Sequence, residues 1–191
     1  MNAREATTTT KATTDVRAKN RGVGFWRFLI GSIFAFALTF IWMLFFTGEV
    51  RALEVISGSM EPTLQKGDRL IVRTLHEGVI PRDSVVIFKS PDDEGPELVK
   101  RVAGVPGDLV EMRRGLIYVN GILSTPPGWK EIDLYWGEDF QKILGAEEYW
   151  VLGDNRMFSH DSTEFGAIGR SLIHGEVVYR YAPGERAGGV Q

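Results

Sequence analysis

Two serines that flank a glycine, Ser57 and Ser59, stand where this sequence could build a hydrolytic centre. They follow the apolar run Leu53–Ile56, and Gly58 and Pro62 interrupt an extended strand at this point. A serine hydroxyl in such a bend can point away from a sheet while neighbouring N–H groups face the same point in space. A serine nucleophile with an oxyanion site needs this arrangement. Serine and glycine are also common in ordinary turns, so a plain strand-to-loop turn is the alternative.

A lysine inside an apolar run could supply the base for such a serine. Lys100 lies within Leu98–Ala103, and Arg101 follows it on the opposite face of the expected strand. If Lys100 points inward, loss of hydration disfavours its charge and lowers its pKa. The neutral amine can then take a proton from a serine hydroxyl. A strand lysine more often points to solvent, and a solvated Lys100 is the alternative.

A third polar stretch, Gly153–Gly166, follows the apolar run Tyr149–Leu152. A solvated loop would explain its many Asp, Asn and Ser residues. A calcium loop would also use them, but the ligand spacing and the final bidentate Glu of an EF-hand are missing. The chain has no cysteine, which excludes disulfides, thiolate nucleophiles and cysteine-ligated metals. Its three histidines match no metal-binding spacing, so we expect no metal and no cofactor.

An uncharged apolar run, Phe28–Phe46, divides the chain into two parts. At ~1.5 Å rise per residue, a helix over this run covers roughly the ~30 Å hydrocarbon core of a bilayer. Trp26 and Trp42 lie near its ends, where indole rings favour the membrane interface. A cleaved signal peptide would be shorter and followed by small residues, and a buried soluble helix would show a polar face. We therefore expect a transmembrane anchor over residues 25–47, with the lipid bilayer as a partner.

The distribution of charge predicts the orientation of this anchor. Residues 1–27 carry a net charge of +4 and the whole chain carries −3, which leaves −7 on residues 28–191. By the positive-inside rule, the N-terminus lies in the cytoplasm, most simply at a plasma membrane, and the part after residue 47 lies outside. Residues 1–24 hold few large apolar side chains, so we expect a disordered tail. The acidic body argues against a nucleic-acid partner.

Short β-branched runs bounded by turn residues dominate the chain after Arg51. The expected strands are Arg69–Thr74, Ser84–Lys89, Leu98–Ala103, Asp108–Arg113, Leu116–Asn120, Tyr149–Leu152 and Glu176–Tyr181. Because no helix-length pattern separates them, they predict an antiparallel, barrel-like β domain. We expect Thr125–Ala146 to be an irregular loop or small lobe. Its aromatic residues, with the adjacent Trp150, would either be core or rest on the membrane. The Gly-rich segment 183–191 is expected to be a flexible tail.

Together, the three polar stretches resemble type I signal peptidases, the membrane-anchored Ser-Lys endopeptidases of the S26 family. Ser57–Leu64 matches the family motif Ser-Gly-Ser-Met-x-Pro-Thr-Leu, and Lys100–Asp108 matches Lys-Arg-Val-x-Gly-x-Pro-Gly-Asp. Gly153–Ser162 matches Gly-Asp-Asn-Arg-x-x-Ser-x-Asp-Ser. The order, the spacing and the preceding anchor also match, over about residues 25–182. The resemblance implies a mainly β fold of the signal-peptidase and LexA type, with residues 48–182 as an extracytoplasmic peptidase domain.

The resemblance also implies roles for individual residues. Ser59 would be the nucleophile, Lys100 the general base, and the Ser57 hydroxyl with the Ser59 N–H the oxyanion donors. Ser159 would hydrogen-bond to the Lys100 amine. Asp154 and Asp161 would brace their loop, by pairing with Arg101 or Arg156. One departure is Thr163, where the family commonly has an arginine that pairs with the residue equivalent to Asp161, so that salt bridge is absent.

In the family, the substrate is a secreted precursor cleaved after small residues of the Ala-x-Ala type. It would lie extended between Leu53–Ser57 and Glu97–Val99. The expected substrate-binding residues share an apolar character and are Val55, Ile56, Met60, Leu64, Leu98 and Val99. Within this function, a specialised peptidase with few clients competes with a general one. Two rival functions are a non-catalytic, membrane-anchored binding module and a self-cleaving Ser-Lys repressor, which would need a DNA-reading domain.

Overall fold

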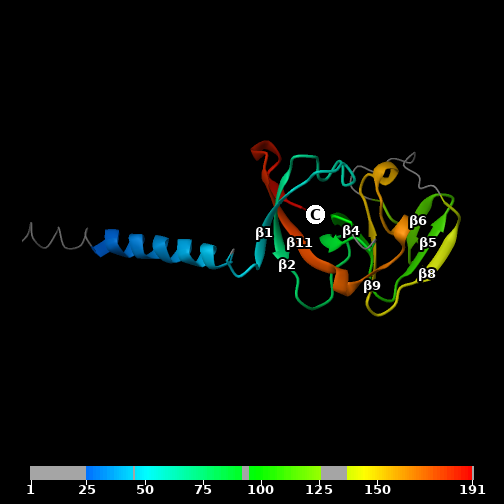
Figure 1. Cartoon of the computed structure of the whole chain (residues 1–191), viewed down its shortest axis with the longest axis horizontal. Helices are drawn as coiled ribbons and strands as arrows, with labels where there is room; N and C mark the ends of the chain where they lie inside the picture. Colours follow the sequence, from blue (N-terminus) through cyan, green and yellow to red (C-terminus); the bar gives the residue numbers. More distant parts are fainter. Residues whose placement is uncertain (1–24, 45, 92–94, 126–136, 191) are drawn as a thin grey trace, which may run out of the picture. The chain divides into compact units, whose positions relative to one another are not determined.

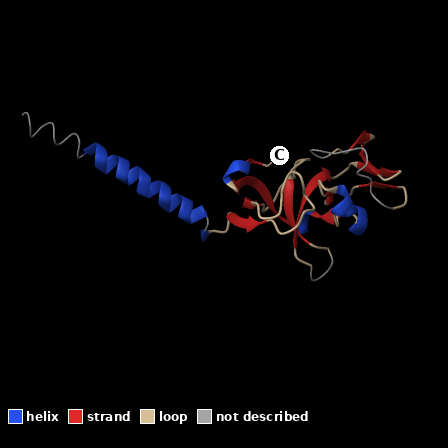
Figure 2. Ribbon diagram, turned by 90° about the horizontal axis from the view of Figure 1, so that it is seen from above, coloured by secondary structure: helices blue, strands red, loops and turns tan. Residues whose placement is uncertain are grey.

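The computed structural model describes residues 25–44, 46–91, 95–125 and 137–190. The chain separates into two compact units, with the division after Thr47. The first holds one long helix. The second, from Gly48 onward, consists of strands joined by loops and short helical turns (Figure 2).

The N-terminal helix runs over Phe25–Leu44 and is long and apolar enough to cross a membrane. Most of its side chains are exposed, including Phe28, Phe34 and Trp42. A polar side chain in a bilayer must find its partner within the protein. The Thr39 hydroxyl does so by donating to the carbonyls of Ala35 and Phe36, at 3.1 and 2.9 Å. The helix confirms the expected apolar span.

The second unit is built from two antiparallel sheets (Figure 1). In chain order, the strands are β1 (Val50–Glu54), β2 (Arg69–Thr74), β3 (Val85–Lys89), β4 (Glu97–Gly104), β5 (Leu109–Arg113), β6 (Leu116–Val119), β7 (Ile122–Leu123), β8 (Phe140–Ile143), β9 (Glu148–Leu152), β10 (Ile168–Gly169), β11 (Ile173–Ala182) and β12 (Gly188–Gly189). The larger sheet has the order β1-β2-β11-β3-β4-β9-β10, with β12 beside β11, and the smaller has the order β7-β6-β5-β8. The expected mainly β fold is confirmed, and each of the seven expected strands is present.

Strand β3 shows why these runs form a curved sheet with core on both sides. It lies between β11 and β4, and its residues Val85–Phe88 are all buried. Val85 and Ile87 belong to one apolar cluster and Val86 and Phe88 to another, as the alternation of side chains along a strand requires. Bulges interrupt the pairing of β11 with β2 and β3, and that of β4 with β9. Bulges bend a strand and increase its twist, so they help to curl the sheet.

The segment Thr125–Ala146 differs from the irregular lobe that the sequence predicts. Its residues Phe140–Ile143 form β8, which pairs with β5 and completes the smaller sheet. Phe140 packs against the buried Trp150 with ring centroids 5.3 Å apart, while Gln141 is exposed. These two aromatic residues therefore belong to the core and not to a membrane-facing surface. Trp129 and Trp136, also expected in this lobe, lie outside the described residues.

The segment after Ala182, expected to be a flexible tail, is instead attached to the domain. Gly184–Arg186 forms a short 3₁₀ turn, and β12 then pairs with β11. Arg186 Nη2 lies 3.3 Å from the carbonyl oxygen of Thr63 and 3.3 Å from the buried Asp68 carboxylate. Arg180 donates to the same Thr63 carbonyl at 2.6 Å. Two arginines near the C-terminus thus hold the loop that follows Ser59.

Arg186→Ala should lower the free energy of unfolding by about 1–2 kcal/mol. A hydrogen bond to a charged group contributes roughly 1.5–3 kcal/mol, and Arg180 would still hold part of the loop. Thermal unfolding of the full chain in detergent micelles measures the effect. Glu185→Ala, an exposed change on the same turn, is the matched control and should be neutral. Equal stability of the two variants would show that Arg186 does not hold this loop.

Candidate active site

The Lys100 amine and the Ser59 hydroxyl meet although 41 positions separate them in the chain. Lys100 Nζ lies 2.8 Å from Ser59 Oγ. Ser59 stands in the loop after β1, and Lys100 stands in β4, which places the amine at a fixed point beside that loop. This distance is within reach of direct proton transfer between a nucleophile and a base.

Burial changes the chemistry of this lysine. The Lys100 side chain is 2% exposed, and its cross-strand neighbour in β3 is the buried Val86. Loss of hydration lowers the pKa of Lys100 below that of a free lysine, and the nearby carboxylates of Asp161, Asp154 and Glu164 partly oppose this effect by attracting the ammonium form. The net shift is downward, which increases the fraction of neutral amine at a given pH.

The Ser57 hydroxyl lies close to the Ser59 hydroxyl. Its Oγ is 3.4 Å from Ser59 Oγ. A hydroxyl at this distance can turn toward an oxygen that develops charge beside Ser59. The Ser57 hydroxyl, one of the two expected oxyanion donors, therefore lies next to the Ser59 hydroxyl in the structure.

Arg101, the residue after Lys100, takes part in a buried ion pair. Its guanidinium donates through Nε and Nη2 to the two carboxylate oxygens of Asp154, at 2.9 and 2.8 Å, and through Nη1 to the Asp83 carbonyl at 2.8 Å. Bidentate pairs of this kind fix both position and orientation. Of the two expected partners, Arg101 and Arg156, Asp154 therefore pairs with Arg101. The pair ties the third polar stretch to β4.

Thr163 supports Asp161 in place of the missing arginine. Asp161 is fully buried and is the N-cap of α2 (Ser162–Phe165). Its Oδ1 accepts from the Thr163 N–H at 3.1 Å and from the Thr163 hydroxyl at 2.8 Å, and its Oδ2 accepts from the Gly153 N–H at 2.9 Å. Thr163 and the Gly153 N–H thus donate to Asp161 although the arginine that the family commonly has at position 163 is missing.

Ser159 does not make the expected hydrogen bond to Lys100. In the part of the chain that the structure describes, its hydroxyl is buried and has no hydrogen-bond partner. The serine nevertheless lies at the centre, because a Cβ added to Gly153 would come within 2.1 Å of Ser159 Oγ and 2.6 Å of the Ser59 carbonyl oxygen. Only glycine leaves room for these two groups at position 153.

Asn155 is a residue of this centre that the sequence analysis did not single out. Its backbone N–H donates to the Ser59 carbonyl and its Nδ2 donates to the Gly58 carbonyl, both at 3.0 Å. It lies within the third motif, but motif membership alone does not reveal which segment its amide contacts. The contact depends on how the loop after β9 meets the loop after β1.

An apolar groove of about 340 Å³ runs beside Ser59 and Lys100. All six expected substrate-binding residues line it: Val55, Ile56, Met60, Leu64, Leu98 and Val99. β1 is the outermost strand of the larger sheet, and Val55 continues its pairing through backbone hydrogen bonds with Asp68 and Gly67. On the other side of the groove, β4 pairs with β9 only from Arg101 onward. The outer edge of β1 and residues 98–100 of β4 therefore keep backbone groups available to an extended peptide.

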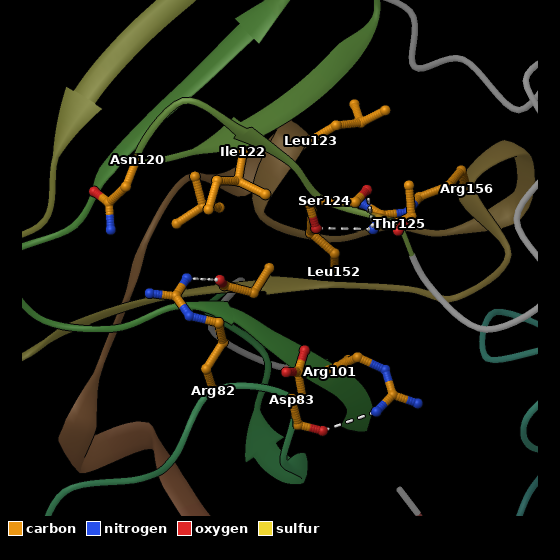
Figure 3. Close-up of a pocket in the computed structure, with 12 residues that line it drawn as sticks. Arg82, Asp83, Arg101, Asn120, Ile122, Leu123, Ser124, Thr125, Leu152 and Arg156 are labelled. Carbon is orange, nitrogen blue, oxygen red and sulfur yellow. Dashed lines mark hydrogen bonds between the residues drawn. The ribbon is translucent and has the colours of Figure 1, made fainter.

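A second hollow, of about 270 Å³, is lined by residues of both sheets (Figure 3). Its arginine side chains form hydrogen bonds within the domain. Arg82 donates to the Ala103 carbonyl at 2.6 Å and to Asp108 at 2.8 Å, and Arg101 reaches Asp83 and Asp154 as described above. Arg156 lies 3.4 Å from the Ser124 carbonyl. We assign no chemistry to this hollow.

Each of the three histidines lies beside a glutamate carboxylate. His76 contacts Glu49, His160 contacts Glu164, and His174 contacts Glu97. Among the described residues, no group of three or more His, Asp or Glu side chains could hold a metal ion.

Comparison with known proteins identifies the family of this chain. The family model described as signal peptidase, peptidase S26, matches residues 26–182. The chain is 33% identical over 175 residues to signal peptidase IB of Staphylococcus aureus strain Mu50, covering 81% of this chain and 90% of that protein. It is 34% identical over 158 residues to signal peptidase I of Leptolyngbya laminosa, covering 75% and 73%.

A solved structure, the signal peptidase I of Enterococcus faecalis V583, aligns with 27% identity and a TM-score of 0.43, over 53% of this chain and 98% of that one. The family match extends from the apolar helix to the end of β11 and includes all three polar stretches. The chain therefore belongs to the signal peptidase family, peptidase S26, and is a serine endopeptidase of the kind that removes signal peptides from secreted precursors.

Proposed function

We propose that this membrane-anchored signal peptidase uses Ser59 as nucleophile and Lys100 as general base. The observation that carries the proposal is the 2.8 Å distance between a buried amine and a serine hydroxyl at the edge of an apolar groove. A solvated strand lysine, which the sequence also allows, would be neither buried nor in contact with Ser59.

The reaction follows from this geometry. The neutral Lys100 amine takes the hydroxyl proton as Ser59 Oγ attacks the scissile carbonyl carbon. The tetrahedral intermediate collapses, the C–N bond breaks, and the Lys100 ammonium gives the proton to the leaving amine, which is the new N-terminus of the mature protein. Water, deprotonated by the same amine, then attacks the acyl-enzyme and releases the signal peptide.

The negative oxygen of the tetrahedral intermediate needs donors that are already in place. The Ser59 N–H and the Ser57 hydroxyl fill this role in our proposal. The 3.4 Å separation of the two serine Oγ atoms supports a hydroxyl donor at this position. The apolar groove beside them excludes water and thereby strengthens both hydrogen bonds.

The groove supports cleavage after small residues. A precursor segment can add to it as an extended strand, with backbone hydrogen bonds for affinity and pockets for alternate side chains. Val55, Met60 and Leu64 are all buried apolar residues of the groove wall, which favours short apolar side chains of the Ala-x-Ala type. We further propose that the N-terminal helix confines enzyme and precursor to one membrane surface, which raises their effective concentration.

Both a general enzyme and a specialised enzyme with few clients fit this groove. Measuring which precursors accumulate after depletion of the protein separates them. A general enzyme would leave many unrelated secreted proteins unprocessed, while a specialised enzyme would leave few.

Ser59→Ala should abolish precursor cleavage with little effect on stability, because it removes only the nucleophilic oxygen. Ser57→Ala should lower kcat by about 10²–10³ and leave a residual rate, since one oxyanion donor remains. Cleavage of a purified precursor measures both. Complete loss in both variants would contradict the division into nucleophile and oxyanion donor.

Activity should rise with pH along a limb whose apparent pKa lies below the ~10.4 of a free lysine. The sign follows from burial, which destabilises the ammonium form of Lys100, so that raising the pH produces the neutral base at a lower pH than in an exposed lysine. Lys100→Arg should be inactive at every pH, because a guanidinium keeps its proton. The pH–rate profiles of both proteins test this, and substantial cleavage by the arginine variant would mean that Lys100 is not the base.

The charge distribution predicts that the peptidase domain lies outside the cytoplasm. A reporter enzyme that is active only outside should work when fused after Gln191, and a reporter active only in the cytoplasm should fail there. Neutralising the basic residues between Arg17 and Arg27 should weaken this orientation, because these charges retain the N-terminus. The opposite reporter pattern would reverse the proposed topology.

A further inference from the structure

We propose that Asn155 is a positioning residue that orients the Gly58–Ser59 peptide bond, so that the Ser59 N–H faces the reacting oxygen. The proposal rests on the function proposed above, in which that N–H is an oxyanion donor. Asn155 itself touches no substrate. It acts through the backbone of the nucleophile loop.

The side chain of Asn155 does not make the hydrogen bond that is usual at its position. Asn155 is the N-cap of the 3₁₀ turn η1 (Arg156–Phe158), a position where an asparagine side chain usually accepts a hydrogen bond from the first turn. Here, its side chain makes no capping bond. It reaches out of its own segment and donates to the Gly58 carbonyl, 97 positions away in the chain, at 3.0 Å.

The Gly58 carbonyl is held from two sides. Besides the Asn155 amide, the Glu61 N–H donates to it at 3.2 Å. A trans peptide bond is planar, so its carbonyl oxygen and its N–H point in opposite directions. Two donors on the Gly58 carbonyl therefore fix the direction of the Ser59 N–H, which points the opposite way within the same peptide plane. Within the described part of the chain, no backbone or side-chain acceptor takes this N–H.

The next peptide bond is held by the same residue. The backbone N–H of Asn155 donates to the Ser59 carbonyl at 3.0 Å. Asn155 thus fixes both peptide planes that flank the nucleophile. Without these contacts, Gly58 would allow the first plane to rotate, because glycine has no Cβ to restrict its backbone dihedrals.

The Asn155 contacts affect the proposed oxyanion donor and not the Ser59–Lys100 pair or the groove. The contact between Lys100 and Ser59 is made by side chains and does not pass through the Asn155 amide. The groove is lined by other residues. Loss of the amide should therefore weaken binding of the tetrahedral intermediate more than binding of the substrate, and should leave the titration of Lys100 unchanged.

The test compares Asn155→Ala with the wild-type full-length protein in detergent micelles. We expect kcat to fall by about 10- to 100-fold, which is at most the loss of rate caused by removing an oxyanion donor itself. KM and the apparent pKa of the pH–rate profile should stay unchanged. Affinity for a peptide aldehyde ending in Ala-x-Ala, which forms a tetrahedral adduct with Ser59, should fall by a similar factor. Affinity for the corresponding peptide alcohol, which forms no adduct, should stay the same.

Two further variants separate positioning from packing. Asn155→Asp keeps the size of the side chain but, when ionised, cannot donate to the Gly58 carbonyl, so its kcat on the pH plateau should fall at least as far as that of Asn155→Ala. Asn120→Ala is the matched control, because it removes an amide with two comparable hydrogen bonds, to Asp108 and the Leu109 N–H. It should lower stability without changing the ratio of aldehyde to alcohol affinity.

Equal loss of aldehyde and alcohol affinity in Asn155→Ala would overturn the proposal, since it would mean that Asn155 supports the groove and not the oxyanion donor. Full kcat in Asn155→Ala or Asn155→Asp would overturn it as well. A failure of the proposed function looks different, because Ser59→Ala would then still cleave precursors or the wild type would not form the aldehyde adduct.

Discussion

The burial of one amine beside one hydroxyl is the constraint on which the rest of this structure depends. Lys100 lies in β4 with almost no solvent contact and within 2.8 Å of Ser59 Oγ. Burial disfavours the ammonium form and lowers the pKa of Lys100, which favours the neutral amine that the proposed mechanism needs. The carboxylates of Asp154 and Asp161 act in the opposite sense, and they are tolerated because each has its own donors.

The loop after β1, the loop after β9 and strand β4 must meet for this pair to form, and specific contacts hold them together. The Arg101–Asp154 ion pair attaches the loop after β9 to β4. The amide and N–H of Asn155 attach that loop to the carbonyls of Gly58 and Ser59. Arg180 and Arg186 hold the Thr63 carbonyl from the other end. The nucleophile loop has little regular structure of its own, so its shape comes from these neighbours.

Local patterns in the sequence predict most of the fold and the chemical groups of the site. The strand positions follow from short β-branched runs between turn residues, and the helix follows from the uncharged run Phe28–Phe46, because both signals arise from neighbouring residues. Ser59, Lys100, Met60 and Leu64 are predicted by their place in the motifs, and the other four groove residues by the apolar runs that precede Ser57 and Lys100. The structure brings all of them together. Strand β8 was missed because Phe140–Ile143 pairs through β5, a contact that leaves no local signal.

By itself, the sequence determined the apolar helix and the β class, since these depend on composition and periodicity. Its three motifs indicated Ser59 and Lys100 through their resemblance to the signal peptidase family. Tertiary structure alone decided which donor meets which acceptor. Thr163 donates two hydrogen bonds to Asp161, and the Ser159 hydroxyl makes no bond to Lys100. The segment after Ala182 is attached to the domain through Arg186 and β12. Each of these contacts joins residues that are placed by backbone geometry within a few tenths of an ångström, and residue type does not encode that placement.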